Sequence, residues 1–464
     1  MRHGPALASI AAALAALPGL WLPFLADDWT LLARAGAPLP RATVDRSLHP
    51  LYLATFWIDR TLWGLSPALF HLTNVALIAL SAALVVAVVR RYARDPLLAL
   101  AAGLLFALHP WHVESAAWVA ARGEPLSACL LLLAILAYDR WREDGRGLPL
   151  LALAFFEAAL LTQESAFILP FVLVVIGVLD RRHRLFPREA LQGLLPVVLV
   201  AAFHVLWLSP WAASGIAQGP EEDRGPGGAL RAVVVVAGTV LPAEAERLAS
   251  RPALTAGLAV IVIGALVTLA WRRSGRPPAL AGALGAVFLC AVAPAVVGFR
   301  ESGLYLAVAA SGTALASLLI RIRGRPARAL AALLSAGWLL ALGHQWLGWA
   351  EAAGAGRRLV DDLVQASLHP GIREIVVVGL PPRVRDRPIA EGDDLMAALA
   401  LSGGRPVAVR TVAPAADGTI SARIAPLPDG SRAVYAWVSG RLEPLLAETG
   451  PPPATGERAR GAGR

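Results

Sequence analysis

Apolar runs of membrane-spanning length, separated by short polar segments, fill most of the chain up to Trp349. An α-helix needs about 20 mostly apolar residues to cross a bilayer, so this pattern predicts about eleven spans. Segment 228–242 is too short and too closely flanked by charge to be one, and we interpret it as a re-entrant or surface helix. The predicted spans are residues 6–25, 67–89, 96–109, 125–138, 148–162, 166–180, 189–209, 252–271, 277–297, 303–320 and 327–348.

After Trp349 the pattern changes to short alternating runs of the kind that form strands. We predict strands near 372–379, 406–413, 419–425 and 433–438, and helices at 351–368 and 392–402. The expected fold is therefore an α-helical polytopic membrane protein with a small C-terminal α/β domain. Its parts are a transmembrane domain (1–349), the α/β domain (350–449) and a Pro/Gly/Arg-rich tail (450–464) that we expect to be disordered.

Composition agrees with a membrane protein. Of 464 residues, 57% are hydrophobic and 16% are charged, whereas soluble proteins carry about 25% charged residues. The net charge is +9, but every basic residue other than His is Arg. We interpret this as a trace of genome base composition and predict no nucleic-acid partner. Cys129 and Cys290 both lie in predicted spans and indicate neither a disulfide nor a metal site.

The distribution of Arg predicts the orientation. Arg-rich loops alternate with Arg-poor ones, and the positive-inside rule places the Arg-rich set in the cytoplasm. The first apolar run is interpreted as an uncleaved span, so about eleven spans put the N-terminus inside and residues 350–464 outside. The predicted cytoplasmic loops are 90–94, 140–142, 181–184, 272–276 and 321–328, and the outer side receives 27–28, 109–124, 163–164, 210–227 and 300–301.

The outer loop 109–124 is the richest in chemistry. It contains His109, His112, Glu114, Arg122 and Glu124 between two apolar runs. Ionisable groups at such positions are costly unless they face water, a partner or a substrate. Arg and His together can hold a phosphate-bearing leaving group through charge-assisted hydrogen bonds. An ordinary polar loop is the alternative, although such loops are usually rich in Ser, Gly and Asn; the His spacing does not match a structural zinc site.

Further ionisable residues are predicted on the same side. Asp27 and Asp28 follow the first span and could deprotonate a hydroxyl, bind a divalent metal or cap the next helix. Composition alone favours the cap. Glu164 at the end of a later span needs a partner. Arg300 and Glu301 form a third charged group, either for substrate or as a simple ion pair.

The first outer loop, residues 26–66, mixes aromatic residues with Arg and Asp. Tyr52, Phe56, Trp57 and Trp63 lie in this segment. The pattern predicts an amphipathic helix at the membrane interface, which would either anchor the chain there or shape a substrate groove.

Four motifs then occur in order along roughly residues 20–350. The first is the acidic pair. The second consists of an HPxHxE-type motif (residues 109–114) followed by an Arg-Gly-acid motif (residues 122–124). The third, Thr162-Gln163-Glu164, is similar to a Ser-Lys-Glu motif, and the fourth, residues 300–306, is similar to ERYLYLP. Asn74 lies in a matching His/Asn-bearing span. This order resembles the membrane glycosyltransferases of the GT-C superfamily, in particular protein O-mannosyltransferases and the transmembrane O-mannosyltransferases that carry TPR repeats. Gln163 replaces the motif's Lys, and an α/β domain takes the place of the TPR array.

The resemblance implies transfer of a hexose or pentose from a polyprenyl-phosphate donor to a hydroxyl acceptor on a protein or an envelope glycan or lipid. Transfer would occur with inversion, on the outer face of a bacterial cytoplasmic membrane. Asp27 or Asp28 would act as the general base on the acceptor or orient it. The donor phosphate would be stabilised by His109, His112, Arg122 and Arg300, with Glu114 and Glu164 orienting these groups. Glu124 and Glu301 complete the substrate-binding set. No cofactor is predicted beyond a divalent metal ion, which stays open. The alternatives are a transporter or flippase for lipids or glycans, and an inactive envelope-assembly partner.

Overall fold

The computed structural model describes residues 3–36, 49–144, 147–179, 192–204, 304–321, 325–385, 387–413 and 431–445. The chain forms two compact units. The first comprises Met1–Phe24 and Leu31–Glu351, and the second comprises Leu25–Thr30 and Ala352–Arg464. The change of pattern in the sequence predicted a boundary after residue 349, but it gave no sign that the short segment Leu25–Thr30 belongs with the C-terminal part.

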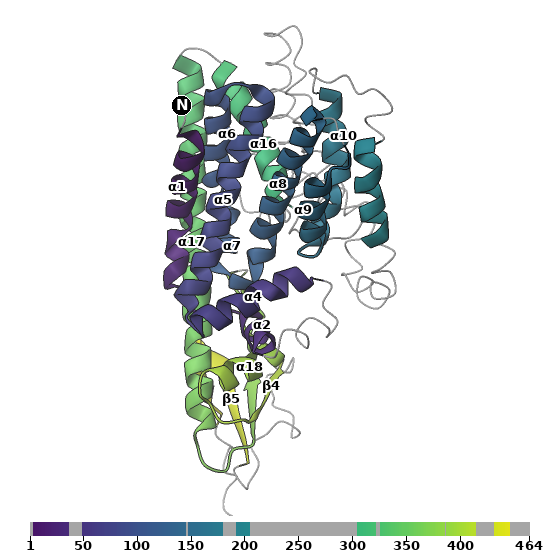
Figure 1. Cartoon of the computed structure of the whole chain (residues 1–464). Helices are drawn as coiled ribbons and strands as arrows, with labels where there is room; N and C mark the ends of the chain where they lie inside the picture. Colours follow the sequence, from purple (N-terminus) through teal and green to yellow (C-terminus); the bar gives the residue numbers. More distant parts are fainter. Residues whose placement is uncertain are drawn as a thin grey trace, which may run out of the picture. The chain divides into compact units, whose positions relative to one another are not determined.

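The first unit is a bundle of helices (Figure 1). Helix α1 packs against α5 and α6, α8 packs against α5 and α9, and α16 packs against α6. The bundle contains α1 (Gly4–Ala16) with its extension η1 (Leu17–Trp21), α5 (Pro67–Ala93), α6 (Pro96–Ala107), α8 (Gly123–Asp144), α9 (Leu150–Leu160), α10 (Leu169–Leu179) and α16 (Leu304–Arg321). Helix α17 (Arg325–Ser367) contributes residues to both units.

Small residues allow α1, α5 and α6 to approach closely. Ala8, Ala82 and Ala102 are fully buried among these helices. A Cβ added to Gly103 of α6 would lie 2.2 Å from Cγ2 of Val86 in α5. Only glycine fits there, as is usual where membrane helices pack through small side chains.

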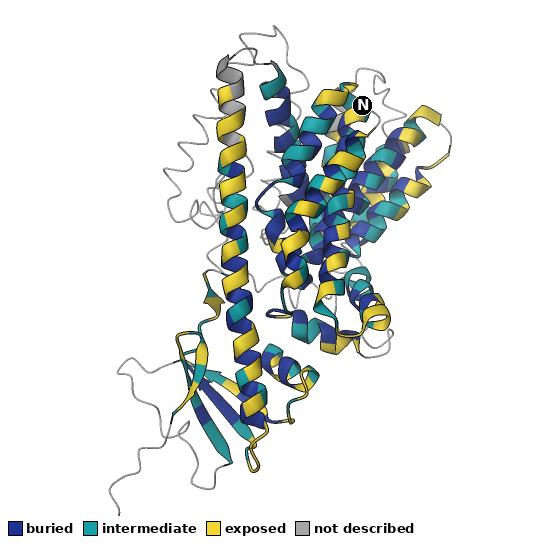
Figure 2. Cartoon of the chain, turned by 90° about the vertical axis from the view of Figure 1, so that its left-hand side faces the viewer, coloured by how far each residue is buried: buried dark blue, intermediate teal, exposed yellow. Residues whose placement is uncertain are grey.

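The outer faces of the helices are apolar and exposed. On α1, Leu7, Ile10 and Leu14 recur at helical spacing and are 50%, 56% and 63% exposed, and Figure 2 shows the same exposed stripe pattern on several helices. Large apolar side chains in such numbers on the outside of a bundle are typical of contact with lipid. The chain is thus a multi-pass membrane protein.

Three helices within the described residues are long and apolar enough to cross a membrane: Gly4–Trp21, Pro67–Ala93 and Val119–Asp144. The predicted spans at 67–89, 96–109, 125–138, 148–162 and 303–320 all coincide with helices of the bundle. The predicted spans 252–271 and 277–297, and segment 228–242, lie outside the described residues.

Two predicted cytoplasmic loops come together. Arg91 at the end of α5 pairs with Asp139 and Glu143 at the end of α8. Nearby, the indole N–H of Trp141 donates to the carbonyl of Gly147 at 3.0 Å. The Arg pattern predicted that these two chain segments share one side of the membrane, and their contacts agree.

The second unit contains a four-stranded sheet with strand order β4-β1-β5-β6. Strand β1 (Glu374–Val378) is parallel to β4 (Ala408–Val412) and β5 (Arg432–Val438), and β6 (Arg441–Pro444) is antiparallel to β5. Helix α18 (Asp393–Leu401) lies in the connection from β1 to β4, after a short hairpin of β2 (Arg383–Val384) and β3 (Arg387–Pro388).

These elements confirm the predicted strands at 372–379, 406–413 and 433–438 and the predicted helix at 392–402. Strand β6 and the hairpin were not predicted. The predicted strand 419–425 and the tail 450–464 lie outside the described residues. The core of this unit joins α17 to the sheet and α18 through Leu359, Leu363, Ile375, Val377 and Leu395.

Candidate functional site

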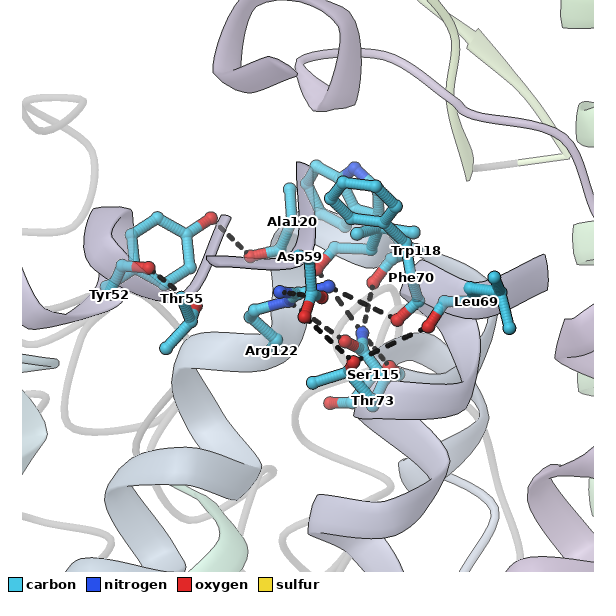
Figure 3. A network of polar contacts seen from close by, with 12 residues as sticks. Tyr52, Thr55, Asp59, Leu69, Phe70, Thr73, Ser115, Trp118, Ala120 and Arg122 are labelled. Atoms are coloured by element: carbon cyan, nitrogen blue, oxygen red, sulfur yellow. Dashed lines mark hydrogen bonds and ion pairs between the residues drawn. The ribbon is translucent and has the colours of Figure 1, made fainter. Parts of the chain in front are cut away.

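The predicted outer loop is anchored by Arg122, which ends the short helix η2 (Val119–Arg122) and is fully buried. Its Nη1 donates to Oδ2 of Asp59 at 2.6 Å, and its Nε donates to Oδ1 of Asn74 at 3.0 Å. Its Nη2 donates to the carbonyl of Phe70 at 3.2 Å. The guanidinium also lies 4.2 Å from the ring centroid of Phe56. We call this set the Arg122 network; Figure 3 shows Arg122, Asp59 and Phe70 among its members.

The same network fixes the loop backbone. Asn74 donates to the carbonyl of Ser115 at 2.7 Å and to those of Trp118 and Val119 at 3.3 Å. His71, one turn earlier on α5, bonds the carbonyl of Ala116 at 2.8 Å. The two side chains share one face of α5, so this helix presents a polar edge that holds α7 (His112–Ala117) and η2.

Helix α4 (Pro50–Trp63) brings the remaining members of the network. Asp59 lies on its buried face and accepts a second hydrogen bond, at 3.1 Å, from Thr73 of α5. The hydroxyl of Tyr52 donates to the carbonyl of Ala120 at 2.6 Å. The sequence predicted an amphipathic helix in this segment but missed Asp59. Asp59 could have been identified because it is an acid on the apolar face of this helix, where a carboxylate needs a partner.

These contacts give Arg122 a positioning role. Its charge is opposed by a buried carboxylate, and its donors hold three elements of the bundle together. Buried ion pairs of this kind are kept only when their hydrogen bonds are satisfied. Direct phosphate binding by Arg122 stays a prediction.

A second cluster, the ring cluster, surrounds His112. The centroid of its imidazole is 4.2 Å from that of Tyr305 in α16, 4.4 Å from that of Phe106 and 5.8 Å from that of His109. His109 in turn packs against Trp338 of α17, with centroids 5.1 Å apart. All five side chains are buried. The second and fourth sequence motifs therefore meet here.

The polar atoms of His112 are poorly engaged. Among the described residues, neither of its ring nitrogens has a hydrogen-bond partner of normal geometry. Burial, and then the nearby His109, hold the pKa of His112 well below its ordinary value, while the carbonyl of Phe106 opposes this weakly. A lowered pKa favours the neutral imidazole, which carries one donor and one acceptor nitrogen.

The acids of the loop lie close to this cluster. Glu114 on α7 is exposed and Glu124 in the first turn of α8 is half-buried. Both are within electrostatic range of the Tyr305 hydroxyl. The loop thus combines buried imidazoles with accessible carboxylates.

The third motif also joins this region. A Cβ added to Gly123 would lie 2.8 Å from Oε1 of Gln163. The N–H of Leu51, at the start of α4, donates to the carbonyl of Leu161 at 3.1 Å. Glu164 begins η3 (Glu164–Ile168), but its side chain lies outside the described part, as do Arg300 and Glu301.

The acidic pair belongs to the second unit and its two members differ. Asp28 begins α2 (Asp28–Ala35), is fully buried, and accepts the N–H of Leu25 on Oδ2 at 2.9 Å. It lies where an acid complements the helix dipole, as the cap interpretation expected. Asp27 is exposed. Within the described residues, no group of three or more His, Cys, Asp or Glu side chains is placed to hold a metal ion.

Comparison with known proteins adds two findings, although no family model matches the chain. Over 134 residues the chain is 34% identical to "Protein O-mannosyl-transferase TMTC1" of Mus musculus. Over 140 residues it is 38% identical to "Protein O-mannosyl-transferase Tmtc2" of Drosophila melanogaster. Each match covers 28% of this chain, but only 13% and 15% of those two proteins.

Among solved structures, the chain is similar to apo ArnT from Cupriavidus metallidurans, with a TM-score of 0.51 and 15% identity over 87% of this chain and 89% of ArnT. The chain therefore shares the fold of ArnT. A structure of the same ArnT bound to undecaprenyl phosphate gives a TM-score of 0.50 at 15% identity, over 88% of this chain and 90% of that one. This ArnT-like fold agrees with the GT-C type of fold expected from the four motifs; the number of about eleven spans stays a prediction.

Proposed function

We propose that this chain is an integral-membrane glycosyltransferase that uses a polyprenyl-phosphate-linked sugar as donor. The acceptor is a hydroxyl group of a protein or of an envelope glycan or lipid, and transfer takes place on the extracytoplasmic face with inversion. The fold shared with ArnT, which binds undecaprenyl phosphate in one structure, supports the donor class. The TMTC relatives, named O-mannosyl-transferases, support the reaction type.

One observation carries the proposal. His112 and Tyr305 come from separate motifs far apart in the sequence, and their rings lie 4.2 Å apart in a buried cluster. A buried imidazole such as His112, whose nitrogens have no partner of normal geometry among the described residues, is costly and calls for a functional explanation. A phosphate ester in an otherwise apolar, lipid-facing bundle is a ligand that would use such donors.

On the donor side, the bond from the anomeric carbon to the phosphate oxygen breaks, and polyprenyl phosphate leaves with the electron pair. His112 and His109 donate hydrogen bonds to the developing negative charge. Arg122 acts through the loop that it holds, since its contacts are with Asp59 and Asn74. Glu114, Glu124 and Glu164 orient the donors, and Arg300 and Glu301 complete this side. These assignments for the last five residues rest on the motifs.

On the acceptor side, the hydroxyl oxygen forms the new bond to the anomeric carbon, and its proton passes to a carboxylate. We assign this base to Asp27, because it is exposed whereas Asp28 is buried and occupied by the Leu25 N–H. Asp28 then positions the base. A single displacement of this kind inverts the anomeric centre.

The direct test is transfer of radiolabel from polyprenyl-phosphate sugars, one hexose and one pentose, in membranes that contain the protein. Label should enter the protein or glycan fraction with the wild type and be lost with Asp27→Asn and with His112→Phe. Asp393→Asn, an exposed acid of α18, is the matched control and should retain activity. Equal label with every variant would overturn the assigned roles, and donor that crosses the membrane without transfer would favour a flippase.

Sidedness has a separate test. Single cysteines at Asp27 and Glu114, in a background without Cys129 and Cys290, should react with a membrane-impermeant thiol reagent from outside intact cells. Reaction of both only after the cytoplasm is opened would invert the topology.

A further inference from the structure

The acidic pair is built into the C-terminal unit. The chain leaves the first unit after Phe24, contributes Leu25–Thr30 to the second unit, and returns to the first at Leu31. Within this segment, Leu25, Ala26 and Asp28 are buried. A stretch otherwise surrounded by membrane helices in the sequence is thus part of the core of a small α/β unit.

Both ends of the segment are anchored there. At its start, a side-chain carbon of Leu25 would lie 3.3 Å from a Cβ added to Gly356 of α17, so the leucine packs directly against this helix. At its end, Trp29 packs on the core formed by α17, α18 and β1. The hydroxyl of Thr30 donates to Oδ1 of Asp394, in the first turn of α18.

Between these anchors the backbone takes a demanding conformation. Ala26 has a φ of +43°, in the left-handed region that non-glycine residues avoid. The N–H of Asp28 donates to the carbonyl of Leu25 at 2.9 Å, and Oδ2 of Asp28 accepts the N–H of Leu25 at 2.9 Å. Such a turn persists only when its surroundings hold it in place. The observed surroundings are α17 and α18.

The contact from Thr30 to Asp394 is suited to this task. Asp394 is half-buried, and burial raises its pKa, while the hydrogen bond from Thr30 lowers it. A hydrogen bond to a carboxylate in a partly desolvated place is stronger than one at the surface. Its neighbour Asp393 is exposed in the same helical turn and provides a natural control.

We propose that the C-terminal unit sets the geometry of the acidic pair, and that Asp394 is a positioning residue that acts on Asp27 and Asp28 through Thr30. This inference rests on the proposed function, in which Asp27 is the base. It gives residues 352–445 a part in the reaction even though they supply none of the groups assigned to the donor.

Hydrogen–deuterium exchange of the full-length protein tests the structural half of the proposal without any substrate. Asp394→Ala and Thr30→Val should accelerate exchange across residues 25–30 by about tenfold, the factor expected when a hydrogen bond to a charged group is lost. Asp394→Asn keeps an acceptor oxygen but loses the charge, so its exchange should lie between those of the wild type and Asp394→Ala. Asp393→Ala should exchange like the wild type. Unchanged exchange in Asp394→Ala would overturn the anchoring.

Transfer kinetics test the functional half. In Asp394→Ala and Thr30→Val, kcat should fall about tenfold while KM for the polyprenyl-phosphate sugar stays the same, with partial rescue in Asp394→Asn. A general loss of folded protein would instead lower the amount of active enzyme in proportion to the folded fraction, which the exchange data report. Wild-type kcat in Asp394→Ala would overturn this inference alone, whereas no transfer by the wild type would overturn the proposed function and leave the exchange result standing.

Discussion

The Arg122 network and the ring cluster are both buried in the helical unit, and they differ in how well their polar atoms are bonded. In the first, Arg122, Asp59 and Asn74 satisfy one another and reach the backbone of the loop. In the second, His112 packs between aromatic rings, and among the described residues its nitrogens have no partner of normal geometry.

The difference separates support from function. A satisfied network rigidifies the structure that it connects, while an under-bonded polar group in a packed core costs free energy that folding alone does not recover. The Arg122 network therefore holds the loop, and we propose that the ring cluster around His112 is the part that binds a ligand. The four predictions below test this division, beginning with the largest effect.

Removing Asp59 should damage stability most. Asp59→Ala leaves the Arg122 guanidinium buried without its counter-ion, which costs about 3–5 kcal/mol. Thermal unfolding in detergent measures the loss. Thr73→Val, which removes only the second bond to the carboxylate, should cost much less, and a paired Asp59→Leu with Arg122→Met should recover part of the stability. An unfolding temperature of Asp59→Ala equal to that of the wild type would contradict the supporting role of the network.

His112 should show the opposite profile. His112→Phe keeps a ring of similar size but removes both nitrogens, so transfer should fall about a hundredfold or more, the usual effect of losing a preorganised donor, with little change in unfolding temperature. His71→Phe is the control, because His71 is hydrogen-bonded to the carbonyl of Ala116. Its replacement leaves this carbonyl without that bond and should lower stability. Equal stability losses in the two variants would erase the contrast.

The pH dependence of stability gives an intermediate effect. Burial holds the folded-state pKa of His112 well below its ordinary value of 6.5. Below pH 6.5, His112 therefore binds a proton in the unfolded chain but not in the folded protein. Stability is full above about pH 6.5 and falls as the pH drops toward the folded-state pKa, by up to ~1.4 kcal/mol per pH unit. Unfolding measured from pH 7.5 to 5 should show a shallower fall in His112→Phe than in the wild type. Parallel curves would mean that the proton binds elsewhere.

The smallest effect is expected at Gly123. A methyl group there meets the flexible end of Gln163, so Gly123→Ala should displace that side chain at a cost of about 1 kcal/mol, the low end for added bulk in a core, and reduce transfer severalfold. Adding Gln163→Ala should relieve the clash. A double variant no more stable than Gly123→Ala would show that the glycine is required for another reason.

The sequence by itself determined the local elements. Apolar length predicted α5, α6, α8 and α9, and alternation predicted β1, β4 and β5, because each depends on residues near one another in the chain. The Arg pattern also predicted which segments share a side. Arg91 and Asp139, which flank two loops predicted on the same side, form an ion pair. The acidic pair belongs to the same unit as residues 352–464, and both segments were predicted on the outer side.

The tertiary structure alone decided the partnerships. Nothing near Arg122 in the sequence indicates that Asp59 opposes its charge, and nothing near Asp27 and Asp28 indicates that Asp394 anchors them through Thr30. Each pair joins positions far apart in the chain, so its existence depends on how whole helices pack. Periodicity and composition indicate which residues of a segment are buried. Which distant side chain pairs with a buried polar residue is decided only when the segments pack together.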